Sequence, residues 1–168
     1  MIFTIPTIQH TGTKFLAKLF GQIHWASFYE KPECDDFLHV GHLTRNSIDA
    51  IKRLNHKIII PLRHPYLVAE SWRRRNKPLD ELEENFHLLV DELDPLNPLY
   101  LPIDVDNRQD YLDQINDDLG LALVTEWGVE NSKKSTYNLS HKDMTPGPTE
   151  KRLAEDIDEF LQRFYSLN

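Results

Sequence analysis

The sequence has little cysteine: Cys34 is the single cysteine among 168 residues. One cysteine excludes a disulfide within the chain and any metal site built from several cysteines. Its neighbours Glu33, Asp35 and Asp36 disfavour the thiolate, because nearby negative charge raises the free energy of an ionised sulfur. We therefore do not expect Cys34 to be a catalytic nucleophile.

Long apolar runs and an excess of positive charge are also missing. No segment approaches the roughly 20 apolar residues that a membrane span needs. The first residues, MIFTIPTIQHTGTKF, lack the basic and then apolar segments of a secretory signal. Lysines and arginines number 19 against 27 aspartates and glutamates, which gives a formal net charge of −8. These features predict a cytoplasmic protein without a nucleic-acid or membrane partner, so any anionic ligand requires a local cluster of basic groups.

Short apolar segments alternate with amphipathic stretches, a pattern typical of an α/β protein with a parallel sheet. We find no domain boundary and expect a single domain over residues 1–168. The expected strands cover residues 2–6, 22–29, 37–43, 57–62 and 99–103. The sequence KIIIPL at 57–62 favours a central strand covered on both faces, because it is apolar at consecutive positions.

The expected helices lie between and after these strands. Asn46 or Ser47 would cap the second helix, Pro65 would begin the third, and Gly120 would end the fifth. The expected helices cover residues 13–20, 47–54, 65–75, 79–93, 111–119 and 150–167. Residues 125–148 show little periodicity, so we expect a long loop there, which is usually functional or disordered.

The segment QHTGTKF after the first strand is a candidate anion site. A helix that begins in a tight turn presents unpaired backbone N–H groups, and the helix dipole adds positive potential. Gly12 would let the backbone approach an anion, while Thr11 and Thr13 would add hydroxyl donors. Lys14 would add a charge. A glycine in such a turn has a purely structural role about as often as it has a binding role. The phosphate-binding pattern G-x-x-x-x-G-K-[ST] is absent, which disfavours a nucleoside triphosphatase.

The segment IIIPLRHPYLVAESW supplies a second candidate site. It places Arg63 at the carboxyl end of the expected central strand, where open α/β sheets bind their ligands. Ser71 follows about two helical turns later. An arginine fork with a hydroxyl nearby suits a terminal phosphate, because the guanidinium offers paired donors.

Together these segments resemble the sulfotransferases that use 3′-phosphoadenosine 5′-phosphosulfate (PAPS). HTGTKF is similar to that family's first turn, K-S-G-T-T-W, and RHPYLVAES is similar to its R-[DN]-x-x-D-V-A-x-S. GHLT stands where the family has T-H-L-P, and it contains His42. LYLPIDVDNRQDYLDQINDDLGL is similar to the family's later strand, acidic dipeptide and helix, so the resemblance covers residues 2–121.

This resemblance implies a P-loop fold, a three-layer sandwich around a central parallel sheet. It implies that PAPS is the co-substrate and that no metal takes part. His42 would be the general base toward a hydroxyl or amine of a small-molecule, lipid or carbohydrate acceptor. The 5′-phosphosulfate would contact Thr11, Gly12, Thr13 and Lys14, the 3′-phosphate Arg63 and Ser71, and the adenine Phe15.

The sequence departs from the family at several positions. His10 stands where the family has the lysine or arginine that steadies the leaving phosphate, so His10 as an imidazolium, or Lys14, would take that role. His64 and Leu67 replace the acidic or amide residues of the second motif. Two alternatives therefore remain open: a nucleotide- or anion-binding protein that has lost turnover, and another P-loop transferase or kinase.

Overall fold

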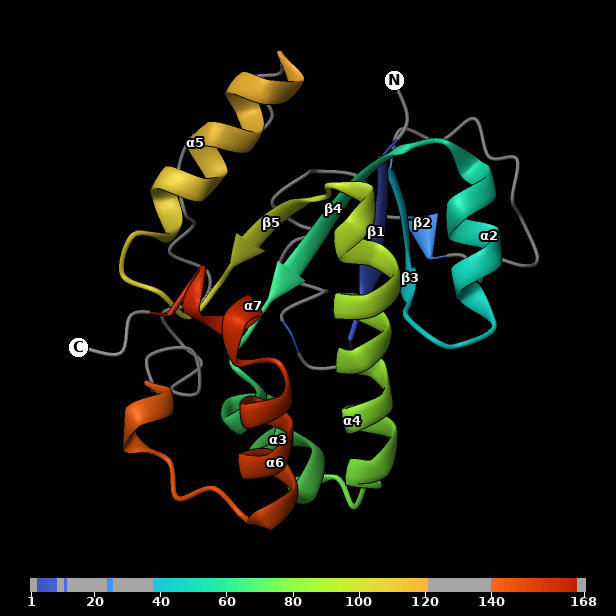
Figure 1. The fold of residues 1–168 in the computed structure, drawn as a ribbon. Coiled ribbons are helices and arrows are strands. Elements are labelled where there is room, and N and C mark those ends of the chain that lie inside the picture. Colours follow the sequence, from blue (N-terminus) through green and yellow to red (C-terminus); the bar gives the residue numbers. More distant parts are fainter. Residues whose placement is uncertain (1–2, 9–10, 12–23, 26–37, 121–139, 166–168) are drawn as a thin grey trace.

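The structure is a computed structural model that describes residues 3–8, 11, 24–25, 38–120 and 140–165 (Figure 1). Within these residues five strands form one sheet in the order β2-β3-β1-β4-β5, and all their pairings are parallel. The strands are β1 Phe3–Thr7, β2 His24–Trp25, β3 Leu38–His42, β4 Lys57–Leu62 and β5 Leu99–Pro102. The α/β class with a parallel sheet is thus confirmed.

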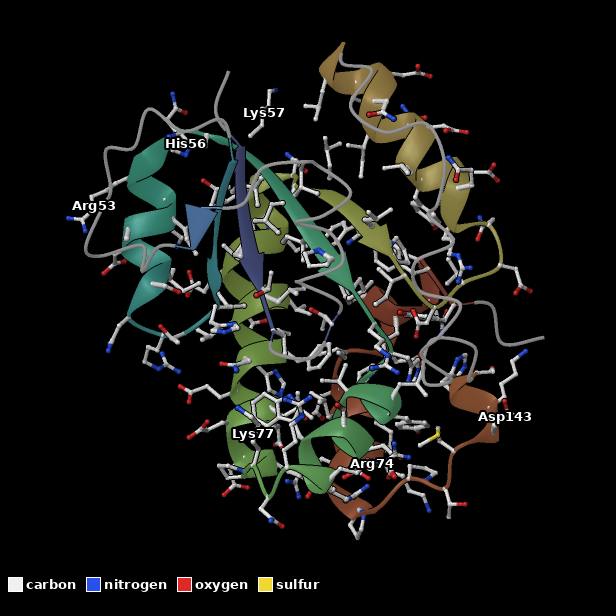
Figure 2. The ribbon with its side chains drawn as sticks, turned by 180° about the vertical axis from the view of Figure 1, so that it is seen from behind. Arg53, His56, Lys57, Arg74, Lys77 and Asp143 are labelled. Atoms are coloured by element: carbon white, nitrogen blue, oxygen red, sulfur yellow. The ribbon has the colours of Figure 1, made fainter. Side chains whose placement is uncertain are left out.

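Strand β4 has the bounds that the sequence predicts, and its burial explains why. Ile59 and Ile60 are both fully buried, although successive residues of a strand point to opposite faces. The sheet is therefore covered on both sides at β4. On one face Ile60 and Leu62 belong to a core cluster that includes Phe86, and in both views α4 lies across that face (Figures 1 and 2).

Most helices begin and end near the predicted residues. The described helices are α2 Ser47–Leu54, α3 Pro65–Arg74, α4 Leu79–Leu88, α5 Arg108–Leu119, α6 Pro148–Asp156 and α7 Asp158–Gln162. Helix α4 continues as a π-helical turn, Leu89–Leu93, and a 3₁₀ turn, Asp94–Leu96, so the predicted helix 79–93 is continuous but changes its winding. Helix α5 ends at Gly120 with φ of 64°, the left-handed cap that was predicted.

Two details of the helix predictions are wrong. Asn46 makes no capping hydrogen bond. Two other hydrogen bonds hold the start of α2: the Thr44 N–H donates to the Ser47 hydroxyl oxygen, and the Ser47 N–H donates to the Thr44 hydroxyl oxygen. In place of the expected helix 150–167 there are two helices, α6, which begins at Pro148, and α7. They meet at Ile157, whose backbone (φ −111°, ψ 25°) departs from helical values. Ile157 and Phe160 are buried in the same core, which favours this bend.

Helices α3, α4 and α6 pack against one another, while α5 packs against β5 (Figure 1). Part of the expected loop 125–148 has structure, since Ser140 caps a 3₁₀ turn, His141–Asp143. No described helix is long and apolar enough to cross a membrane. The predicted helix 13–20 and the predicted strand 22–29, apart from β2, lie outside the described residues.

Candidate functional site

The strand order identifies one place in the sheet where a ligand crevice is expected. Strands β1 and β3 are neighbours, yet the chain that leaves β1 continues to β2 beyond β3, and the chain that leaves β3 continues to β4 beyond β1. Adjacent strands whose connections run in opposite directions form a topological switch point, and open α/β sheets bind ligands at the carboxyl ends of such strands. Thr7 and His42 are the last residues of β1 and β3.

Thr7 and His42 contact each other at this switch point. They are register partners across the two strands, and the Thr7 Oγ1 atom lies 3.3 Å from His42 Nδ1. Thr7 is fully buried, whereas His42 is partly covered and keeps part of its surface exposed. The Leu43 N–H also donates to the Thr7 carbonyl over 2.7 Å, so the chain beyond His42 stays attached to β1. The imidazole is therefore oriented through Nδ1, and Nε2 is its second nitrogen.

The surroundings of His42 favour its neutral form. Desolvation lowers the pKa of His42 below its usual 6.5, and the positive charge of Lys77 lowers it further. Lys77 lies in the connection between α3 and α4, with its ammonium 5.4 Å from the centre of the Trp72 ring (Figure 2). A histidine with a lowered pKa is unprotonated at neutral pH, which is the state that a general base needs.

Arg63 lies directly after β4, the strand on the opposite side of β1 from β3, and its residue is 5% exposed. Its positive charge acts on Asp104, which follows β5, at the same edge of the sheet. Asp104 accepts hydrogen bonds from the His64 N–H over 2.9 Å and from the Tyr165 hydroxyl over 2.7 Å. Burial raises the pKa of Asp104, while these two hydrogen bonds and the Arg63 charge oppose that rise. Asp104 thus links the backbone beside Arg63 to the C-terminal segment.

His64 caps α3 and holds the C-terminal part of the chain against the end of β4. Its Nδ1 accepts from the Tyr66 N–H over 3.2 Å, which places the ring proton on Nε2. The His64 and His141 rings stack with centroids 4.1 Å apart and an angle of 11°, and Tyr165 meets both rings edge-on. Burial, as the main cause, and electrostatic repulsion from His141 together lower the pKa of His64 to about 3. Sequence reasoning missed this role, although a polar residue before Pro65 is a capping signal.

The remaining predicted site residues have different outcomes. Ser71 lies half-buried on α3, on the helix that Arg63 precedes. Thr11 is buried, and its hydroxyl donates to the Ile8 carbonyl over 2.6 Å, which closes a turn directly after β1. Five other predicted residues lie outside the described part of the chain, so their contacts stay predictions: His10, Gly12, Thr13, Lys14 and Phe15.

Among the residues that the structure describes, one group of side chains has ligand atoms close enough for a metal ion. Glu83 and His87 on α4 and Asp156 on α6 place these atoms within 4.8 Å of one another. Arg152, however, donates to both Glu83 carboxylate oxygens, over 3.3 and 2.8 Å. A guanidinium in that position repels a cation, so we assign no metal to this group.

The class that the fold and this site define is a parallel α/β protein with an imidazole and a buried arginine at the carboxyl ends of its strands. Comparison with protein-family models and with curated proteins gave no match to the sequence. Chemically, the edge offers a neutral nitrogen that can accept a proton and a planar cation that can hold an oxyanion.

Proposed function

We propose that this chain is a sulfotransferase-type protein that binds PAPS along the carboxyl ends of β1, β3 and β4. His42 would be the general base, and the acceptor would be a hydroxyl or amine of a small molecule, lipid or carbohydrate. The observation that supports the proposal is the Thr7–His42 contact at the switch point, because an oriented, neutral imidazole then lies where open α/β sheets in general bind ligands. The segment resemblance to sulfotransferases supplies the type of reaction.

The proposed reaction is an in-line displacement at sulfur. The acceptor oxygen or nitrogen forms a bond to sulfur, the bond between sulfur and the 5′-phosphate oxygen breaks, and its electron pair leaves with the phosphate. His42 Nε2 takes the acceptor's proton, provided that Nδ1–H donates to Thr7 Oγ1. General-base catalysis of this kind contributes about 10²- to 10⁴-fold in rate.

Arg63 would bind the 3′-phosphate of the nucleotide. Its guanidinium offers five donors in a fixed plane, more than one neighbouring carboxylate can accept. Asp104, whose two oxygens accept from the His64 N–H and the Tyr165 hydroxyl, balances the Arg63 charge at the same end of the strands. Ser71 on the following helix would add a hydroxyl to the same phosphate, as the family's second motif implies.

A binding protein without turnover is the second candidate, and the contact of Thr11 favours it. The single hydroxyl proton of Thr11 is donated to the Ile8 carbonyl, so in this arrangement Thr11 cannot donate to a phosphosulfate oxygen. The phosphosulfate would then have one donor fewer than the family's first turn provides. Such a protein would bind the nucleotide through Arg63 and yet transfer sulfate slowly or not at all.

A thermal-shift titration tests nucleotide binding first. Adenosine 3′,5′-bisphosphate should raise the melting temperature more than adenosine 5′-monophosphate, ATP or inorganic sulfate does, because it alone carries a 3′-phosphate. Arg63→Lys, which keeps the charge but loses the fork, should remove most of that difference. An equal response to the bisphosphate and the monophosphate contradicts the assignment of Arg63, and a response to ATP alone supports a kinase.

A transfer assay with radiolabelled PAPS and a panel of acceptors then separates the two candidates. His42→Ala should lower turnover by about 10²- to 10⁴-fold and leave the thermal shift with the bisphosphate unchanged. His87→Ala, which removes an imidazole from the surface of α4, is the matched control and should retain turnover. Turnover that survives in His42→Ala would remove His42 from the mechanism.

A further inference from the structure

A pocket lies at the opposite end of the sheet from the proposed site. It has a volume of about 680 Å³ and is formed by the end of α2, the start of β4 and the turn before β5. Lys57 begins β4 and Arg63 follows it, so a strand of six residues, roughly 20 Å long, separates the two regions. The lining residues are Ile51, Lys52, Asn55, His56, Lys57, Ile58, Leu96 and Asn97.

Positive charge gathers at this edge of an otherwise acidic protein. The sequence KRLNHK at 52–57 places three cationic side chains and an imidazole within six residues, against a net charge of −8. Figure 2 shows Arg53, His56 and Lys57 at this end of α2 and β4. Lys52 is paired with Glu92 over 2.5 Å, whereas Lys57 has no ion pair within the described structure. Lys57 is therefore the ammonium available to an anion in this pocket.

Two asparagines supply neutral polar groups on either side. Asn55 ends α2 and Asn97 ends the 3₁₀ turn Asp94–Leu96, and both have left-handed backbones with φ of 51° and 55°. Glycine is the usual residue in that conformation, because it has no Cβ to clash. Asparagine at both positions instead adds two amide groups that can donate to an oxyanion. The carboxyl end of α2 presents carbonyl oxygens rather than N–H groups, so side chains must hold the negative charge.

The pocket also has apolar side chains in its lining. They are Ile51, Ile58 and Leu96, and Leu96 is the one large hydrophobic side chain that is exposed in the described part of the chain, at 42%. His56 is anchored by its Nδ1, which lies 2.7 Å from the Thr4 hydroxyl, and burial lowers the pKa of His56. His56 thus contributes a neutral, anchored ring to the lining of the pocket.

We propose that this pocket binds a small amphipathic anion. Its oxyanion group contacts Lys57 and the amides of Asn55 and Asn97, and its apolar part packs on Ile58 and Leu96. The volume fits a small organic molecule, and small-molecule sites combine apolar walls with a few polar groups in this way. The site does not depend on sulfuryl transfer, because it lies at the other edge of the sheet.

An NMR titration of the whole chain with phenyl phosphate, benzoate, inorganic phosphate and phenol tests this proposal. Phenyl phosphate or benzoate should shift the His56 ring signals and the side-chain amide signals of Asn55 and Asn97 with millimolar affinity, and phenol or inorganic phosphate should bind more weakly. Whichever of the two anions binds more tightly identifies the oxyanion as a phosphate or a carboxylate.

Charge variants show whether the pocket itself is responsible. Lys57→Gln should weaken binding by about five-fold, whereas Lys151→Gln on α6 makes the same change of charge elsewhere and should leave the affinity unchanged. Equal weakening in both variants, or no shift at His56 and Asn97 at about 10 mM of either anion, overturns the proposal. Inorganic phosphate that binds as tightly as phenyl phosphate overturns the assigned role of the apolar wall.

Discussion

Acid should destabilise this protein through the buried imidazole of His64. The ring stacks on His141, caps α3, and has a pKa lowered by burial to about 3, against 6.5 in an unfolded chain. The unfolded chain therefore takes up a proton below pH 6.5 that the folded protein excludes. The contribution of His64 to the free energy of unfolding is complete above pH 6.5 and is lost as the pH falls toward 3.

The size of this effect follows from the two pKa values. A difference of roughly 3.5 corresponds to about 5 kcal/mol in full, of which about 2 kcal/mol is lost between pH 6.5 and pH 5. Other groups that contact His64 also titrate. His141 acts in the same direction because its pKa is lowered, whereas Asp104 acts in the opposite direction because burial raises its pKa. A comparison with variants at position 64 is needed to isolate the His64 contribution.

Urea unfolding at about pH 7 and about pH 5 makes that comparison. His64→Asn keeps an acceptor that can cap α3, and His64→Phe keeps a ring that can stack, but neither side chain titrates. The wild type should lose about 2 kcal/mol more than either variant between the two pH values, or roughly 4–8 °C in melting temperature. A wild type that loses no more than both variants would refute the reasoning, because the imidazole would then be protonated in the folded protein.

Three further changes have defined outcomes. Lys77→Gln removes a positive charge that lowers the pKa of His42, so an NMR titration of the His42 ring should give a midpoint closer to 6.5 than in the wild type; an unchanged midpoint would contradict this electrostatic effect of Lys77. Gly120→Ala forces a side chain into a left-handed position with φ of 64° and should lower the free energy of unfolding by about 1 kcal/mol, as measured in urea. Trp72→Ala empties a site that is 2% exposed and should cost about 3–5 kcal/mol in the same assay; a cost under about 1 kcal/mol would mean that the side chain is not buried in solution.

Much of the secondary structure was predictable because its signals are local. The consecutive isoleucines of KIIIPL marked a strand buried on both faces, and β4 has those bounds. Pro65 marked the start of α3, since proline needs no hydrogen-bond partner in the first turn, and Gly120 marked the end of α5. The bend at Ile157 was missed, because the apolar spacing on either side of it fits one continuous helix.

The candidate site was predictable only in part. Sequence motifs selected His42 and Arg63, and the structure puts both at the carboxyl edge of the sheet. Nothing in the sequence pointed to Thr7 as the partner of His42, because that contact depends on β3 lying beside β1, and these strands are not consecutive along the chain.

Composition and motif spacing by themselves determined the α/β class, most helix and strand positions and the two residues from which the site was proposed. Tertiary structure alone decided the strand order, the stacking of His64 on His141, and the pocket that brings Asn55 and Asn97 together. The physical reason is the distance along the chain between the residues that interact. Helices, strands and caps follow from residues a few positions apart, whereas these contacts join segments that meet only when the whole core is packed.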